Sequence, residues 1–381
     1  GMRTVRASLT SIANDPFRAQ LSLTMAPAPQ PLRGEVSLRN DGSSGSGEYR
    51  ATGALLKNAL ALPGDTLLLF GEVDGTDTPE LGTVIGSLSY TLPVSDTVGL
   101  TGSFGYNRRT QVELPSPDDL FTNEQYQGAL QLEWTFLERM LQRWSLSASL
   151  TRSESVNSFD GEQLSSYYPS LFANPRSGYL RLALNGSGLS GPLSWNGSAF
   201  VLQGLGAMTP ADQRQDLARF GVEPGQASAV GSLVSGSWAF APTWQLQLRG
   251  GGQVAFHPLT APMQFTLGSD VGLRGLPSQL VSGNSGWLAS GELEWTVWKT
   301  GMQALQLVPF LGAGGVYFNS LNGGRTSDTI GSGGALIRWL QGDTLSLELG
   351  YVSTFNDANT PGSWNDWLLG KGLYAKASYR F

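Results

Sequence analysis

The sequence contains no cysteine, a single histidine and few charged residues, which make up only 14% of its 381 residues. Without cysteine, disulfide frameworks and thiolate metal sites are excluded. Soluble globular proteins usually have about 25% charged residues, so this composition is not typical of a soluble domain. Because one histidine, His257, leaves little basis for a metal site or a serine–histidine hydrolase, we predict no enzyme, no metal and no cofactor.

Long apolar runs are absent as well. No stretch approaches the about 20 apolar residues that a transmembrane helix needs. The chain is rich instead in glycine (50 residues) and in aromatic residues (Trp 11, Tyr 11, Phe 16), with a mean hydropathy of -0.11. This combination is typical of a transmembrane β-barrel, whose strands turn apolar residues to lipid and small polar residues to the lumen. The net charge of -6 argues against nucleic acid as a partner.

Alternation with a period of two recurs from Gly34 onward and predicts strands. In residues 144–151, tryptophan, leucine and alanine alternate with serine and threonine. The polar face holds serine, threonine, glutamine and glycine rather than lysine and glutamate, as expected for a lumen. The pattern predicts about sixteen strands near the ~9 to 11 residues that a tilted membrane strand needs. Their approximate spans are 34–41, 47–57, 65–74, 80–92, 96–107, 124–136, 142–154, 176–186, 192–204, 227–241, 243–256, 286–298, 304–318, 329–341, 342–355 and 370–381.

Connections between these strands alternate between short and long. Short turns lie at 62–65, 93–96 and 242–243, and long loops lie at 111–123, 155–175, 206–227 and 256–286. In outer-membrane barrels the short turns face the periplasm and the long loops face outside. An even number of strands closes the sheet, so that no strand edge is exposed to lipid. Within one long loop, residues 210–221 are predicted to form a short helix.

The two ends of the chain differ from its body. Residues 1–33 hold a strand-like segment, 17–25, followed by a proline-rich piece, 26–32, that is typical of an extended linker. About 30 residues cannot bury a core of their own, so we predict the tail of a preceding domain. Gly1-Met2 indicates that the native N-terminus lies further upstream. The last predicted strand has an apolar face that includes Tyr379 and ends on Phe381, which resembles the signal read by the assembly machinery of bacterial outer-membrane proteins.

A motif in the last of the four long loops carries a lone arginine between small and apolar residues. Leu273-Arg274-Gly275-Leu276 resembles the (V/I)RG(Y/F) motif of the outer-membrane assembly and two-partner secretion superfamily. Further segments match the secretion branch, the TpsB-type transporters, in their order along the chain: 40–49, 58–65, 267–269, 291–293 and 309–314. The resemblance implies an all-β, sixteen-stranded antiparallel transmembrane barrel over residues 34–381, with this loop folded into the lumen. It also implies that residues 1–33 are a remnant of a periplasmic POTRA domain and its linker.

In that superfamily the motif arginine meets an aspartate of a Phe-x-Asp-x-Gly strand on the inner wall. Here the corresponding strand has Phe310, Gly312 and Gly314, with Gly312 in place of the aspartate. An unpaired guanidinium in a confined lumen is costly, so another carboxylate is needed. The candidate counter-charges are Asp270, Glu292 and Glu294.

Glu292 and Glu294 lie two residues apart on one predicted strand and share a face, so that one arginine fork could bridge both. Gly272 and Gly275 allow the loop backbone to turn sharply close to the wall. Other charged residues of the wall strands are expected to form a polar lining rather than a catalytic set; they are Arg50, Arg181, Arg249, Glu133 and Glu348.

The resemblance implies an outer-membrane translocation pore for an unfolded secreted polypeptide, gated by the loop that carries Arg274 and working without ATP. Two alternatives stay open, namely an insertase or assembly factor of the same superfamily and a passive porin-like channel. The expected partners are the secreted polypeptide, outer-membrane lipids and, during biogenesis, the barrel-assembly machinery. The chain is expected to be a monomer in the bacterial outer membrane, with its N-terminus in the periplasm.

Overall fold

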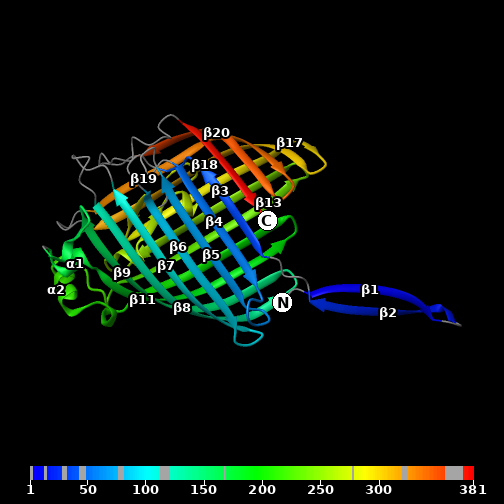
Figure 1. The fold of residues 1–381 in the computed structure, drawn as a ribbon, viewed down its shortest axis with the longest axis horizontal. Coiled ribbons are helices and arrows are strands. Elements are labelled where there is room, and N and C mark those ends of the chain that lie inside the picture. Colours follow the sequence, from blue (N-terminus) through cyan, green and yellow to red (C-terminus); the bar gives the residue numbers. More distant parts are fainter. Residues whose placement is uncertain are drawn as a thin grey trace.

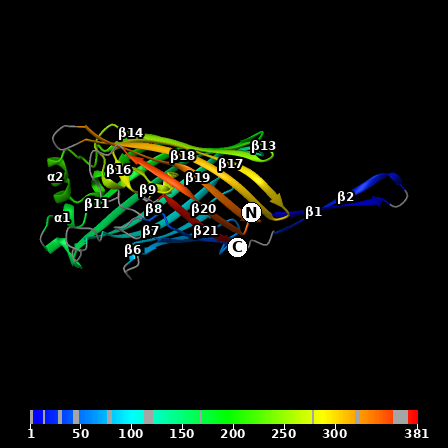
Figure 2. The same ribbon diagram turned by 90° about the horizontal axis from the view of Figure 1, so that it is seen from above.

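The computed structural model describes residues 3–12, 15–27, 32–42, 49–75, 81–111, 121–166, 168–276, 279–319, 325–356 and 372–381. Most of them belong to one closed antiparallel barrel of 16 strands (Figures 1 and 2). Each strand pairs with the next along the chain, and the last pairs with the first. Within these residues no helix is long and apolar enough to cross a membrane.

The barrel strands are β3 (Arg33–Arg39), β4 (Tyr49–Asn58), β5 (Thr66–Gly75), β6 (Leu81–Pro93), β7 (Val98–Gln111), β8 (Phe121–Arg139), β9 (Gln142–Phe159), β11 (Arg176–Ser190), β12 (Leu193–Gly204), β13 (Ser228–Ala241), β14 (Trp244–Ala255), β17 (Ser285–Thr300), β18 (Gln303–Asn319), β19 (Arg325–Gln341), β20 (Leu345–Asn356) and β21 (Leu373–Arg380). A short β10 (Glu162–Gln163) extends β9 into a hairpin. Outside the barrel sheet, β1 (Arg3–Ile12) pairs with β2 (Asp15–Pro27), and this hairpin projects from the end with the short turns (Figure 1).

The fold class predicted from the alternation is confirmed, and most strands begin and end within a few residues of the predicted spans. The main difference is length. The strand predicted at 142–154 continues to Phe159. Residues 155–158 contain a single apolar residue, Val156, which is too little alternation to predict a strand there. The helix predicted for 210–221 is α2 (Ala211–Arg219), which lies near α1 (Ser170–Ala173) at the end with the long loops.

Side chains along each strand point alternately to lipid and to the lumen. Tryptophans collect on the outer face at the end with the short turns, namely Trp134, Trp144, Trp195, Trp238, Trp244 and Trp295. The rings of Trp244 and Trp295 stack with their centroids 5.1 Å apart. An aromatic girdle of this kind marks a membrane–water interface, because indole rings are apolar but carry one polar group.

The connection from β14 to β17, residues 256–284, folds back into the lumen; we call it the lumen loop. Its stem consists of β15 (Phe265–Leu267) paired with β16 (Val281–Gly283). Between them, residues 268–276 and 279–280 belong to its tip, which includes a 3-10 turn, η4 (Ser269–Val271). Gln253 of β14 donates to the carbonyl oxygens of Met263 and Asn284, at 3.0 and 3.1 Å, and so holds the two legs of the loop together.

Leucines of the lumen loop pack into an apolar area of the inner wall. Leu267, Leu273 and Leu276 are at most 1% exposed. They cluster with wall residues of β17 to β21, namely Leu288, Val308, Phe310, Val316, Ile330, Leu336, Val352 and Tyr374. The expectation that apolar residues face lipid and small polar residues face the lumen is therefore wrong for this part of the wall. The inner wall is apolar here because it receives the loop, and each buried leucine contributes about 1.5–3 kcal/mol.

The seam between the last strand and the first closes the barrel. β21 and β3 pair from Lys376–Arg39 to Arg380–Glu35. Among adjacent wall strands in the described part of the chain, this pair has the fewest paired residues. Phe381 and Gly34 exchange both backbone hydrogen bonds, at 2.9 and 3.0 Å. At the other end of the seam, the side-chain amide of Asn40 bonds the backbone of Leu373 and Ala375. Side-chain and terminal contacts thus lengthen a short seam.

Candidate functional site

The tip of the lumen loop presents Arg274 through a tight backbone turn. The N–H groups of Gly272 and Leu273 donate to the carbonyl oxygens of Ser269 and Gly268, both at 3.2 Å. Gly272 and Gly275 have φ of 109° and 80°, a left-handed conformation that glycine adopts without strain. A Cβ atom at Gly275 would also lie 2.6 Å from Val352 Cγ1 on the wall. Both glycines are therefore needed for the tip to lie against the wall.

Arg274 is held by carboxylates from two wall strands that are not neighbours. Its guanidinium donates to both oxygens of Glu292 on β17, with Nη2 2.9 Å from Oε2 and 3.1 Å from Oε1. Its Nη1 donates to Glu348 Oε2 on β20 at 2.7 Å and to the Tyr374 hydroxyl on β21 at 3.4 Å. Charge-assisted bonds of this forked kind are among the strongest polar contacts in proteins. The tip is thus attached across the inner faces of β17 to β21.

Aromatic rings complete the surroundings of Arg274. The guanidinium carbon lies 5.8 Å from the ring centroid of Phe310 and 5.7 Å from that of Tyr374. A cation over an aromatic face is attracted by the negative face of the ring. Phe310, the first residue of the expected inner-wall motif, therefore contacts the motif arginine, although Gly312 carries no charge.

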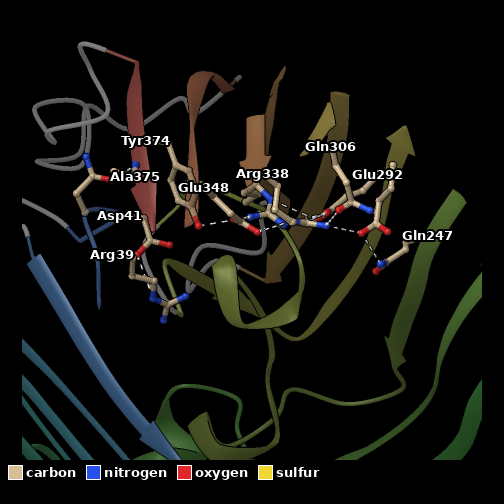
Figure 3. A network of polar contacts seen from close by, with 12 residues as sticks. Arg39, Asp41, Gln247, Glu292, Gln306, Arg338, Glu348, Tyr374 and Ala375 are labelled. Carbon is tan, nitrogen blue, oxygen red and sulfur yellow. Dashed lines mark hydrogen bonds and ion pairs between the residues drawn. The ribbon is translucent and has the colours of Figure 1, made fainter. Parts of the chain in front are cut away.

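A second arginine, Arg338 on β19, is fixed in the wall beside the same carboxylates. Its Nη1 lies 2.6 Å from Glu294 Oε1, its Nε 2.8 Å from Glu348 Oε1 and its Nη2 3.8 Å from Glu292 Oε2. Figure 3 shows the chain of contacts between Gln247 and Tyr374, in which Glu294 links Gln247 to Arg338, Glu348 follows, and Arg274 links Glu348 to Tyr374. The fork of Arg274 binds Glu292, and Glu294 is paired with Arg338 instead.

The three predicted counter-charges therefore have different outcomes. Glu292 pairs with Arg274, and Glu294 pairs with Arg338 and accepts a hydrogen bond from Gln247 at 2.8 Å. Asp270 lies in η4, and its side chain is outside the part of the structure that is described. Glu348, expected only as part of a polar lining, is a direct partner of Arg274. Alternation could place Glu348 and Arg338 on the lumen face. It could not show that they lie at the same height along the barrel as Arg274, because local sequence does not determine the register between strands.

Gly312 has a packing role that explains the missing aspartate. A Cβ atom there would lie 3.0 Å from Leu273 Cδ2 of the tip and 3.0 Å from Ser290 Cβ of β17. At Gly314 it would lie 2.7 Å from Leu267 Cδ2 of the stem. The two glycines of the inner-wall motif thus make room for the leucines of the lumen loop.

Three comparisons with known proteins bear on this barrel. The family model of the haemolysin secretion/activation proteins ShlB/FhaC/HecB matches residues 19–335. The chain belongs to this family. A search of curated proteins finds no match.

Solved structures with the same fold are similar to this chain. CdiB from Escherichia coli is 17% identical with a TM-score of 0.74, and the match covers 99% of this chain and 67% of that one. CdiB from Acinetobacter baumannii is 16% identical with a TM-score of 0.68, covering 100% and 65%. BamA from Haemophilus ducreyi lacking POTRA domains 1-3 is 14% identical with a TM-score of 0.58, covering 99% and 75%. The chain thus spans about two thirds of the length of the two CdiB chains.

Family membership and the closed barrel together identify an integral protein of the bacterial outer membrane, of the two-partner secretion type. The resemblance inferred from the sequence motifs is thereby confirmed. The family consists of secretion transporters rather than known enzymes. At these identities, the likeness to CdiB and BamA shows the fold alone.

Proposed function

We propose that this barrel is the translocation pore for an unfolded secreted polypeptide and that the tip of the lumen loop gates it. The observation that carries the proposal is the attachment of Arg274 to Glu292 and Glu348, on two strands that are not neighbours. A tip fixed in this way lies across the inner wall, and a chain crossing the lumen has to displace it or pass beside it. In this proposal residues 1–33 are the end of a periplasmic POTRA domain that delivers the polypeptide.

The contacts of the tip are suited to a two-state element. Two buried leucines and one arginine hold it, and each group has a complementary partner on the wall, so the docked state is well defined. When Arg274 leaves, Arg338 still lies within 2.8 Å of Glu348 and 3.8 Å of Glu292. The wall carboxylates thus keep a cation when the tip is released, which makes release reversible.

The stem and the tip differ in how firmly they are held. The stem is a hydrogen-bonded hairpin whose base is tied to β14 by Gln253. The tip contacts the wall through side chains and a turn rich in glycine. In the proposed motion, the tip therefore swings about a stem that stays in place.

The alternative of an insertase has one observation in its favour, the small number of residues that pair between β21 and β3. An insertase needs this seam to open, whereas a translocation pore needs only the tip to move. Trapping the tip without touching the seam therefore separates the two functions.

A disulfide between the tip and the wall tests the gate, in a chain with no native cysteine. A Cβ atom at Gly275 lies 3.3 Å from Val352 Cβ, near the about 3.5–4.5 Å that a disulfide spans. The double variant Gly275→Cys/Val352→Cys is oxidised, and single-channel currents are recorded in planar lipid bilayers. A cysteine at the φ of Gly275 costs about 1–2 kcal/mol, which the covalent bond can hold.

The matched control is Thr266→Cys/Ser282→Cys, whose residues face each other in the stem, so that this disulfide stays within the loop. We expect large openings to disappear from the tip-to-wall disulfide and to return after reduction, while the stem disulfide opens as the parent does. Equal currents from both oxidised proteins would rule out gating by the tip.

A further inference from the structure

One row of the inner wall carries an unusual run of charges across the seam. In this row each residue is the cross-strand partner of the next, from β19 to β5: Arg338, Glu348, Lys376, Arg39, Arg50 and Asp74. Three successive members, Lys376, Arg39 and Arg50, are cations, and Lys376 faces Arg39 directly across the seam. Like charges directly opposite each other destabilise strand pairing, so this row needs carboxylates around it.

Arg50 of β4 lies at the centre of such a carboxylate cluster and is 1% exposed. It forms ion pairs with Asp41 and Asp74, both at 3.3 Å, and with Glu72. Arg39 shares two of these acids, with Nη2 2.9 Å from Glu72 and Nε 3.3 Å from Asp41. A buried arginine is tolerated only when its charge is matched closely, and here three carboxylates fix its position.

From this fixed position Arg50 also reaches the lumen loop. Its Nη1 donates a hydrogen bond to Ser269 Oγ, at 3.1 Å, and Ser269 begins the turn of the tip. Five residues further along, Arg274 is attached to β17, β20 and β21. The bond to Ser269 comes from β4, on the other side of the seam. The tip therefore has contacts on both sides of the joint between the last strand and the first.

We propose that Arg50 is a positioning residue that fastens the tip of the lumen loop from the far side of the seam. The proposal deepens the gating function proposed above, because it assigns a second attachment to the same tip. Release of the tip then requires two separate events, loss of the Arg274 ion pairs and loss of the Arg50–Ser269 hydrogen bond. Arg50 acts by holding Ser269 and has no role in contact with the polypeptide.

The test uses exposure of the wall beneath the tip and does not depend on secretion. Val352 is 0% exposed and lies under Gly275. A single substitution, Val352→Cys, places one thiol there, and a water-soluble thiol reagent modifies it only when the tip lifts. The whole chain in lipid vesicles is labelled over time, with the reagent on both sides of the membrane.

In this background Ser269→Ala removes the hydroxyl that Arg50 binds and leaves every charge in place. We expect about ten-fold faster labelling, an order-of-magnitude figure for losing one hydrogen bond to a charged group. Ser269→Thr keeps a hydroxyl and is expected to label at the parent rate. Ser282→Ala is the matched control, because Ser282 Oγ donates to Gln264 Oε1, at 3.1 Å, so that its hydrogen bond stays within the loop.

The double variant Ser269→Ala/Arg274→Ala tests whether the two attachments are separate. Independent attachments multiply their effects, so labelling should be faster than in either single variant. Labelling of Ser269→Ala at the parent rate, with faster labelling of Arg274→Ala, would overturn the role of Arg50. If Ser269→Ala speeds labelling but channel openings do not change, the attachment stands and gating by the tip fails.

Discussion

At the scale of single residues, Gly312 shows how a change in a motif can follow from packing. The family pattern led us to expect an aspartate opposite Arg274, and the sequence alone indicated only that another carboxylate had to replace it. The structure shows the reason for the glycine, because Leu273 fills the space that a side chain at 312 would need. Glu292 on β17, one of the three candidates named from the sequence, and Glu348 on β20 contribute the carboxylates instead.

Gly312→Asp therefore should not restore the family contact. An aspartate would overlap Leu273 and is expected to destabilise docking of the tip by about 1–3 kcal/mol, as other overpacked sites do. The measurement is the labelling rate of Val352→Cys, which should rise. Gly105→Asp is the control, since Gly105 also faces the lumen but its Cβ would have no contact closer than 4.0 Å. Equal labelling in both variants would contradict the packing explanation.

Arg338 and Arg274 are predicted to differ in what they stabilise. Removing Arg338 leaves Glu294 with Gln247 as its remaining polar partner among the contacts described above, and takes from Glu348 the arginine whose Nε lies 2.8 Å from its Oε1. Loss of one partner from a buried pair typically costs about 3–5 kcal/mol.

Arg338→Met should therefore lower the unfolding temperature of the barrel, measured by heat-dependent migration on a gel, more than Arg274→Met does. Arg338→Met/Glu294→Gln should recover part of the loss, because the unpaired charge is gone. A larger loss in Arg274→Met would show that the tip arginine, and not Arg338, supports the wall.

At the scale of elements, the turn between β4 and β5 depends on one buried carboxylate, Asp65. Burial raises the pKa of this group, but hydrogen bonds from the Tyr90 hydroxyl and from the N–H groups of Leu62, Ala61 and Leu60 outweigh burial. They lower the pKa from its ordinary 3.8 to about 2. The contribution of Asp65 to stability is therefore complete above pH 3.8 and disappears as the pH falls through 2.

Asp65→Asn should remove this contribution at neutral pH. The free energy of unfolding of the parent, measured by urea titration in lipid vesicles, should fall between pH 4 and pH 2 more steeply than that of Asp65→Asn. Parallel pH curves for the two proteins would show that the carboxylate does not hold the turn.

Local sequence was sufficient to predict the strands, and it failed where contacts join distant strands. Alternation placed Glu292, Glu294 and Glu348 on the lumen face, because that face follows from a period of two. It could not bring Arg274 to β20, since the level of each strand depends on pairings along the whole wall. Arg50, expected only as part of the lining, joins the tip through contacts that span more than two hundred residues of sequence.

At the scale of the whole molecule, the barrel is asymmetric inside. The tip of the lumen loop and its apolar and charged contacts occupy β17 to β21 and cross the seam to β4, and the base of the loop packs through Leu259 and Met263 against apolar residues of β11 to β13. Hydroxyl side chains pair on β6 and β7, as in Thr91–Thr101. Composition predicted a hollow barrel but not this division, because it averages over the wall. The division suits a pore in which one side holds the gate and the other stays hydrated.

The most direct test of the central claim is secretion in cells that express the tip-to-wall disulfide variant, Gly275→Cys/Val352→Cys, together with a secreted partner polypeptide. The oxidising periplasm permits the disulfide to form, and added reductant opens it. We predict that the partner stays out of the medium until reductant is added, while the stem disulfide, Thr266→Cys/Ser282→Cys, secretes normally throughout. Normal secretion through a fully cross-linked tip would contradict gating by the lumen loop.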